Sequence, residues 1–117
     1  MVLDRAPRLD RVFHALAHPA RRAMLRELTL GERNLTELAS PFDMSFPAAS
    51  KHVRVLEEAD LVRRRVEGRS HVCTINAEPL KNVSDWTNGF RRFWEERFEA
   101  LDNYLEELQK KERRDDA

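Results

Sequence analysis

Cysteine is nearly absent from this chain, which has one among its 117 residues, so an internal disulfide and a disulfide-stapled scaffold are excluded. No apolar run approaches the roughly 18 residues that a membrane-spanning helix needs, and residues 1–5 lack the apolar core of a signal peptide. The chain has only three glycines and 36% charged residues, a composition that favours helices. We therefore expect one helix-rich domain in the cytoplasm, with no membrane partner.

Residues that could perform catalysis or hold a metal are also few. Neighbouring carboxylates fall on predicted helices, where a polar outer face explains them, so we expect no enzyme activity and no cofactor. His71 and Cys73 share one face of a predicted strand, but a metal site needs at least a third ligand. His14 and His18 are one helical turn apart, yet Pro19 should end that helix and separate them. The sequence therefore predicts no metal site.

Charge is balanced over the whole chain but not along it. Residues 1–76 contain 13 Arg or Lys and 10 Asp or Glu, a net charge of +3, whereas residues 77–117 contain 8 and 11, a net charge of −3. A modest basic surface on the first segment can attract phosphate groups, because the acidic excess lies in the second segment. The overall charge of zero is the one feature that favours a protein without DNA binding.

The stretch from residue 44 to residue 62 has the features of a helix that enters a DNA major groove. Ser45 is a good N-cap, and Pro47 fits the first turn, where a missing N–H costs nothing. Apolar residues at helical spacing predict one narrow buried stripe: Ala49, Val53 and Leu56. The opposite face is small, polar or basic: Ala48, Ser50, Lys51, His52 and Arg54. Such a helix suits base reading, although an ordinary surface helix has a similar pattern.

A basic hairpin follows this helix directly. Residues 61–66 and 70–76 read as two short strands, and Gly68 between them can adopt the positive φ of a tight turn. The first strand carries three consecutive arginines: Arg63, Arg64 and Arg65. Strand alternation sends Arg64 to one face and its neighbours to the other, and we expect at least one of the three to pair with a carboxylate. Arg69 at the tip is the best candidate to contact a phosphate or the minor groove of DNA.

Three further helices are predicted before the helix in the stretch from residue 44 to residue 62, which is called the recognition helix below. Apolar spacing places them over residues 9–17, 20–28 and 35–39. Pro19 separates the first two, and Asn34 is a suitable N-cap for the third. Residues 40–44 form the turn into the recognition helix. A helix-turn-helix followed by a hairpin is a winged helix-turn-helix.

The order and spacing of these elements resemble the ArsR-type family of winged-helix repressors from about Leu9 to Ile75. The resembling segments are residues 17–22 (AHPARR), 35–39 (LTELA), 50–57 (SKHVRVLE) and 67–69 (EGR). The resemblance implies repression by blocking a promoter. Many members sense metals through paired cysteines in the first helix of the motif, or through histidine and acidic residues on the last helix. This sequence has neither set of ligands.

The C-terminal segment is predicted to form the subunit interface. After a break at residues 76–79, a helical pattern runs to about Lys111, with a kink near Asn88 and Gly89. Both tryptophans and three of the six phenylalanines lie in its single apolar stripe, more aromatic area than this core needs, although packing within the chain is an alternative. The predicted interface comprises Leu9, Phe13, Trp86, Phe90, Phe93, Trp94, Phe98, Leu101 and Leu105.

These observations predict a mainly α fold with a small β-hairpin, a winged helix-turn-helix whose N- and C-terminal helices form a dimer interface. In one domain, residues 9–76 form the DNA-binding core, 77–111 the dimerisation helix and 112–117 a fraying tail. We expect a sequence-specific transcriptional regulator, a homodimer on a pseudo-palindromic double-stranded operator. The predicted DNA contacts are Ser45, Ala48, Ser50, Lys51, His52, Arg54, Arg64 and Arg69. The alternatives are a protein-interaction module without DNA binding and a redox- or small-molecule-responsive regulator of the same fold.

Overall fold

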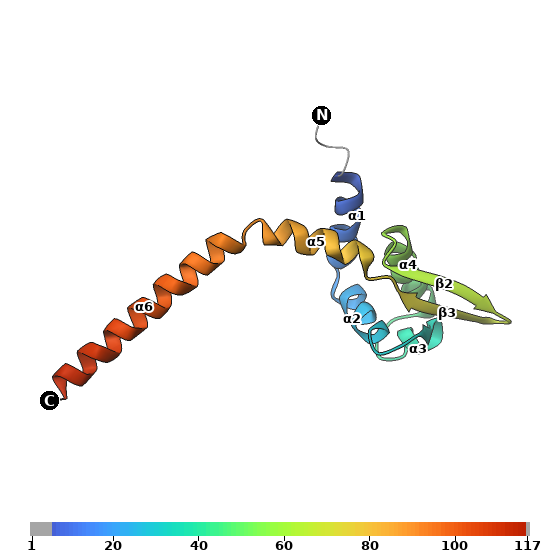
Figure 1. Ribbon diagram of the computed structural model, residues 1–117. Coiled ribbons are helices and arrows are strands. Elements are labelled where there is room, and N and C mark those ends of the chain that lie inside the picture. Colours follow the sequence, from blue (N-terminus) through green and yellow to red (C-terminus); the bar gives the residue numbers. More distant parts are fainter. Residues whose placement is uncertain (1–5, 117) are drawn as a thin grey trace. The chain divides into compact units, whose positions relative to one another are not determined.

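The computed structural model describes residues 6–116 and divides into two units, Met1–Val83 and Ser84–Ala117 (Figure 1). The elements in chain order are α1 (Ala6–Leu16), α2 (Pro19–Leu28), β1 (Arg33–Asn34), α3 (Leu35–Ala39), α4 (Phe46–Glu58), β2 (Val62–Glu67), β3 (Ser70–Ile75), α5 (Glu78–Asn88) and α6 (Arg91–Asp115). The expected mainly α fold with a β-hairpin is therefore confirmed. Among residues 6–116, no helix is both long enough and apolar enough to cross a bilayer.

Local capping fixes the start of three helices. The Asn34 side chain accepts a hydrogen bond from Glu37 N at 2.8 Å, and the Glu37 carboxylate accepts one from Asn34 N at 3.1 Å, a complete capping box for α3. Ser45 Oγ accepts from Ala48 N at 3.3 Å at the start of α4. Both caps agree with the sequence prediction. His18 caps α2 through Nδ1, a role that the sequence did not indicate.

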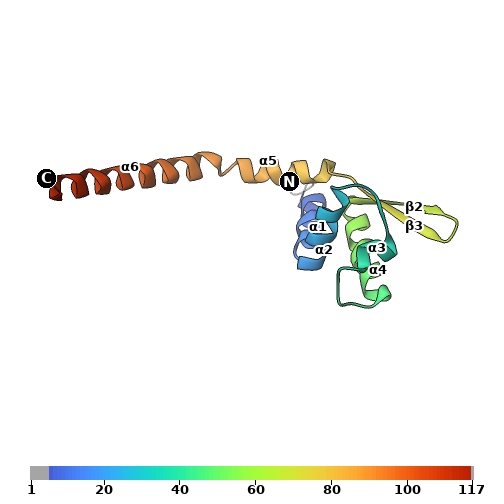
Figure 2. The same ribbon diagram turned by 90° about the horizontal axis from the view of Figure 1, so that it is seen from below.

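The core of the first unit surrounds α4. Ala49, Val53 and Leu56 of this helix are fully buried, as their spacing predicted. They belong to one apolar cluster with residues of α1, α2, α3 and the hairpin: Val12, Met24, Leu38 and Val62. The turn residues Phe42 and Met44 pack against the same cluster and are half-buried. Figure 2 shows α3 and α4 side by side.

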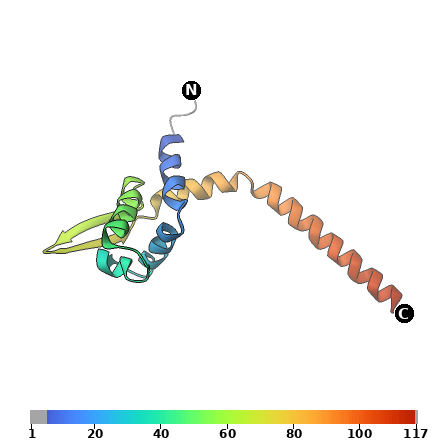
Figure 3. The same cartoon turned by 180° about the vertical axis from the view of Figure 1, so that it is seen from behind.

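The sheet has three strands, one more than the hairpin predicted from the sequence. β2 and β3 pair antiparallel from Val62 opposite Ile75 to Glu67 opposite Ser70, and β1 pairs with the other edge of β3. Gly68 adopts a φ of 61° in the tight turn, as expected. The β2–β3 hairpin, called the wing below, projects beyond α1–α4 (Figure 3). β1 is only two residues long and has no alternating pattern, so its pairing depends on the position of β3.

The second unit is almost entirely α6. The predicted kink is a break between α5 and α6 at Gly89 and Phe90, and α6 continues to Asp115, beyond the expected end at Lys111. No α6 residue is buried. Two ion pairs between residues four apart join polar side chains of α6: Arg91 with Glu95 at 2.9 Å and Arg92 with Glu96 at 3.2 Å. The aromatic stripe stays about half exposed, with Trp94 at 54% and Phe98 at 61%.

Candidate nucleic-acid interface

The side of α4 away from the core carries most of the predicted DNA contacts. Lys51 and Arg54 are exposed, Ala48 and Ser50 are half-buried, and Ser45 caps the helix at its exposed end. Because buried Ala49, Val53 and Leu56 fix the helix from behind, these side chains point outward in one row. The row contains two cations, two hydroxyl groups and a small methyl group, which suits close approach to base edges and phosphates.

His52 is held by protein partners as well as facing solvent. Its Nδ1 lies 3.2 Å from Arg21 Nη1, and its ring centroid lies 4.4 Å from that of His18. Because a guanidinium only donates, Nδ1 is the acceptor in this bond. Burial, then the charges of His18 and Arg21, lower the pKa of His52 from its ordinary value, which favours the neutral ring.

Arg21 holds His52 in this position, a role that the sequence pattern did not indicate. It is buried, with 8% of its surface exposed, and its Nε donates to Ala15 O at 2.7 Å. Its Nη2 donates to His14 O at 2.9 Å. Arg21 therefore joins the end of α1 to His52 on α4 and fixes the angle of the recognition helix. The segment AHPARR contained it, but nothing in the spacing distinguished it from the neighbouring exposed arginine.

Two of the three consecutive wing arginines are engaged in ion pairs. Arg64 pairs with Glu57 on α4, and its Nη1 also lies 3.3 Å from His71 Nδ1 on β3. Arg64 Nε is buried without a hydrogen-bond partner among the described residues. Arg64, predicted to contact DNA, thus faces the protein. Its pair with Glu57 fixes the wing against the recognition helix.

Arg65 forms a second, exposed ion-pair group. It binds the two Glu32 oxygens at 2.7 and 2.9 Å and Glu67 Oε1 at 2.7 Å. These hydrogen bonds raise the pKa of Arg65 above its usual range, and the bond from Arg65 lowers the pKa of Glu32. Within residues 6–116, Arg63 and Arg69 have exposed guanidinium groups without an ion pair. Arg69 at the wing tip is therefore open to a phosphate.

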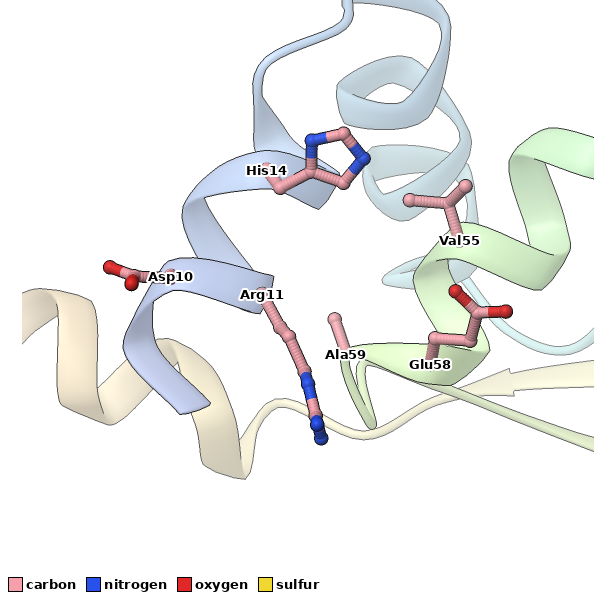
Figure 4. Close-up of a pocket in the computed structure, with 6 residues that line it drawn as sticks. All are labelled: Asp10, Arg11, His14, Val55, Glu58 and Ala59. Carbon is pink, nitrogen blue, oxygen red and sulfur yellow. The ribbon is translucent and has the colours of Figure 1, made fainter. Parts of the chain in front are cut away.

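A hollow of about 560 Å³ lies between α1 and the C-terminal end of α4 (Figure 4). Asp10, His14 and Glu58 line it, a set that could bind a metal if the three converged. Figure 4 shows the Asp10 carboxylate turned away from His14 and Glu58. Over residues 6–116, no three histidine, cysteine or acidic side chains are grouped so that they could hold an ion. His18, the residue paired with His14 in the sequence prediction, lies beyond the end of α1, and its ring is tilted by 45° to that of His52.

Cys73 is fully buried in the core. Burial raises the pKa of its thiol, while the Arg64 charge acts in the opposite direction and the Glu57 charge adds to the rise. A raised pKa keeps the sulfur protonated, which makes it a poor nucleophile. The environment is that of a structural thiol packed among apolar residues.

Comparison with known proteins agrees with this geometry. A family model described as a helix-turn-helix domain matches residues 16–65, the span from the end of α1 to the middle of β2. The crystal structure of an ArsR family transcriptional regulator, RHA00566, is 39% identical, with a TM-score of 0.72, over 77% of this chain and 93% of that one. The chain belongs to the ArsR family of winged helix-turn-helix transcriptional regulators.

Two further relatives of this ArsR-family chain add detail. The arsenical resistance operon repressor of Staphylococcus xylosus is 30% identical over 65% of this chain and 73% of its own length. A solution structure from Mycobacterium bovis, described as a homodimeric winged helix-turn-helix DNA-binding domain, is 27% identical, with a TM-score of 0.61, over 76% of this chain and 86% of that one. The ArsR-family chain is a DNA-binding transcriptional regulator, a class of protein that is not enzymatic.

Proposed function

We propose that this ArsR-family regulator is a homodimeric repressor that places α4 of each subunit in the major groove of a pseudo-palindromic operator. The observation that carries the proposal is the row of exposed polar and basic side chains on α4, held by a helix face that is buried in the core. Two such helices, related by a two-fold axis, meet half-sites about 10 bp apart or a multiple of that spacing. A dimer bound there covers promoter DNA and excludes the transcription machinery in the cytoplasm.

The proposed contacts divide according to the geometry of the site. Ser50, Lys51 and Arg54 reach base edges and phosphates, while Arg69 at the wing tip binds the backbone or minor groove. Ser45 and Ala48 lie where the start of α4 approaches the duplex. His52 keeps only Nε2 for DNA because Arg21 takes Nδ1, and Arg64 supports the site through Glu57.

The proposed dimer uses the stripe on α5 and α6 together with Leu9 and Phe13 of α1. Trp86, Phe90, Phe93, Trp94, Phe98, Leu101 and Leu105 are roughly half exposed in the single chain, which is a high cost for aromatic side chains. Homodimer interfaces are richer in such residues than the remaining protein surface. The relative from Mycobacterium bovis, described as homodimeric, supports an assembly of two chains.

The test is binding of the full chain to the DNA upstream of its own gene, followed by gel mobility shift. Ser50→Ala with Lys51→Ala should weaken binding at least tenfold, since each lost contact contributes on the order of 1 kcal/mol. The matched control is Lys81→Ala with Ser84→Ala, which removes the same two side-chain types from exposed positions of α5. Equal affinity of the two double variants would refute docking through α4. A folded wild-type chain without affinity for DNA would favour the protein-interaction alternative.

A further inference from the structure

A second hollow, of about 240 Å³, lies where the starts of α3, α4 and β3 meet. It is lined by Asn34, Leu35, Thr36, Phe46, Arg69, Ser70 and His71. Five of these seven side chains carry a hydrogen-bond donor, and none is a carboxylate. The volume is below the roughly 300 Å³ at which pockets for organic ligands begin. A lining of donors without acidic groups suits a small anion.

The hollow lies between the start of the recognition helix and the tip of the wing. Phe46 is the first residue of α4, the recognition helix, and Arg69 is the exposed residue at the tip of the wing. A duplex that takes α4 into its major groove brings one sugar-phosphate strand along the edge between the helix and the wing. Phosphate oxygens receive half or more of the hydrogen bonds in protein–DNA interfaces, from hydroxyl, amide and basic groups. The hollow holds donors of all these kinds.

A hydrogen-bonded chain of three side chains determines which ring nitrogen of His71 carries the proton. Glu57 of α4 binds the Arg64 guanidinium, and Arg64 Nη1 lies 3.3 Å from His71 Nδ1. A guanidinium has no acceptor, so Nδ1 accepts and the proton of the neutral ring is on Nε2. Among residues 6–116, no protein group bonds to Nε2. The ring therefore lines the hollow with one N–H donor unused.

We propose that this hollow binds one backbone phosphate of the operator, that His71 Nε2–H donates to a phosphate oxygen, and that Arg64 is a positioning residue for His71. The proposal rests on the proposed DNA-binding mode and adds a contact residue that the sequence did not indicate. Arg69 supplies the positive charge, while Ser70 and Thr36 supply neutral donors. Arg64 acts through the ring and not on DNA, in contrast to its expected role.

The first experiment measures operator affinity by fluorescence anisotropy at salt concentrations from about 50 to 200 mM. His71→Ala should weaken binding about tenfold at every salt concentration, with an unchanged salt slope, because a neutral donor displaces no counterion. Arg69→Ala should instead lower the slope by about 0.9, the value for one phosphate contact. His71→Gln, whose amide N–H can replace Nε2–H, should restore most of the affinity. Exposed His14→Ala is the matched control and should match wild type.

The second experiment locates the phosphate and tests Arg64. Ethylation interference should show one phosphate whose modification weakens operator binding by wild type but not by His71→Ala. An operator with a neutral methylphosphonate at that position should bind wild type and His71→Ala equally. Arg64→Ala should lose at least as much affinity as His71→Ala, because it also breaks the ion pair with Glu57, and the double variant should lose no more than Arg64→Ala. Arg63→Ala removes the same charge from the other strand face and controls for net charge. Unchanged affinity in His71→Ala, or additive losses in the double variant, would overturn the proposal. A wild-type chain that binds no DNA would refute the proposed function instead.

Discussion

Arg21→Met should destabilise the first unit strongly although it leaves the apolar volume nearly unchanged. The last carbonyl groups of α1 lack helical partners, and that of Ala15 would need the N–H of residue 19, which is Pro19. Arg21 Nε replaces this donor at 2.7 Å, inside a site where the arginine is 8% exposed. Water therefore has little access to the carbonyl oxygen when the guanidinium is removed.

The expected size follows from the bonds that are lost. Leaving the buried Ala15 oxygen without a donor costs about 1–3 kcal/mol. His14 O loses the Arg21 bond but keeps the N–H of Ala17 at 3.2 Å, and His52 Nδ1 loses its donor, for about 0.5–1.5 kcal/mol each. We expect a total of about 2–6 kcal/mol, a large share of the 5–15 kcal/mol typical of a domain.

The neighbouring residue provides the control. Arg22 also donates to a carbonyl of α1, Leu16 O at 2.7 Å, but its side chain is exposed, so water can replace it. Arg22→Met should therefore cost no more than about 0.5 kcal/mol. The assay is urea unfolding of the full chain, followed by circular dichroism. A loss in Arg21→Met no larger than that in Arg22→Met would refute the view that Arg21 is the structural cap of α1.

Three further predictions concern acidity, backbone strain and assembly. Because the folded pKa of His52 is lowered, the unfolded chain binds this proton first, so the free energy of unfolding should fall as pH drops below about 6.5. His52→Asn, which keeps an acceptor for Arg21, should lose that part of the pH dependence of the unfolding free energy. A pH dependence identical to that of wild type would show that His52 is not its source. Asp60 has a φ of 59°, so Asp60→Gly should raise the unfolding free energy by about 1 kcal/mol, and a decrease would show an unrecognised role for its side chain. Trp94→Glu with Leu101→Glu should give monomers in sedimentation at micromolar concentration, whereas Asn103→Glu with Gln109→Glu, with the same added charge on α6, should not. A monomeric wild type would refute the proposed dimer.

The sequence by itself determined the elements whose causes are local. Asn34 and Ser45 cap their helices because a side chain bonds to an N–H only three residues away. Ala49, Val53 and Leu56 are buried because helical spacing places them on one side, and Gly68 forms the turn because it adopts positive φ without strain. The family resemblance used the same short segments, and comparison with known structures confirmed it.

The partners of charged side chains were decided only by the tertiary structure. Strand alternation correctly separated Arg64 from its neighbours, but it could not show that Arg64 meets Glu57 or that Arg65 meets Glu32, which is 33 residues away. The bond between Arg21 and His52 joins residues 31 apart, and β1 exists only because β3 lies beside it. Such contacts depend on how helices and strands pack around α4, and residue spacing along the chain carries no information about that packing. For this reason the sequence predicted which side of α4 is buried and which is polar, while the residues that hold this helix in place became visible only in the fold.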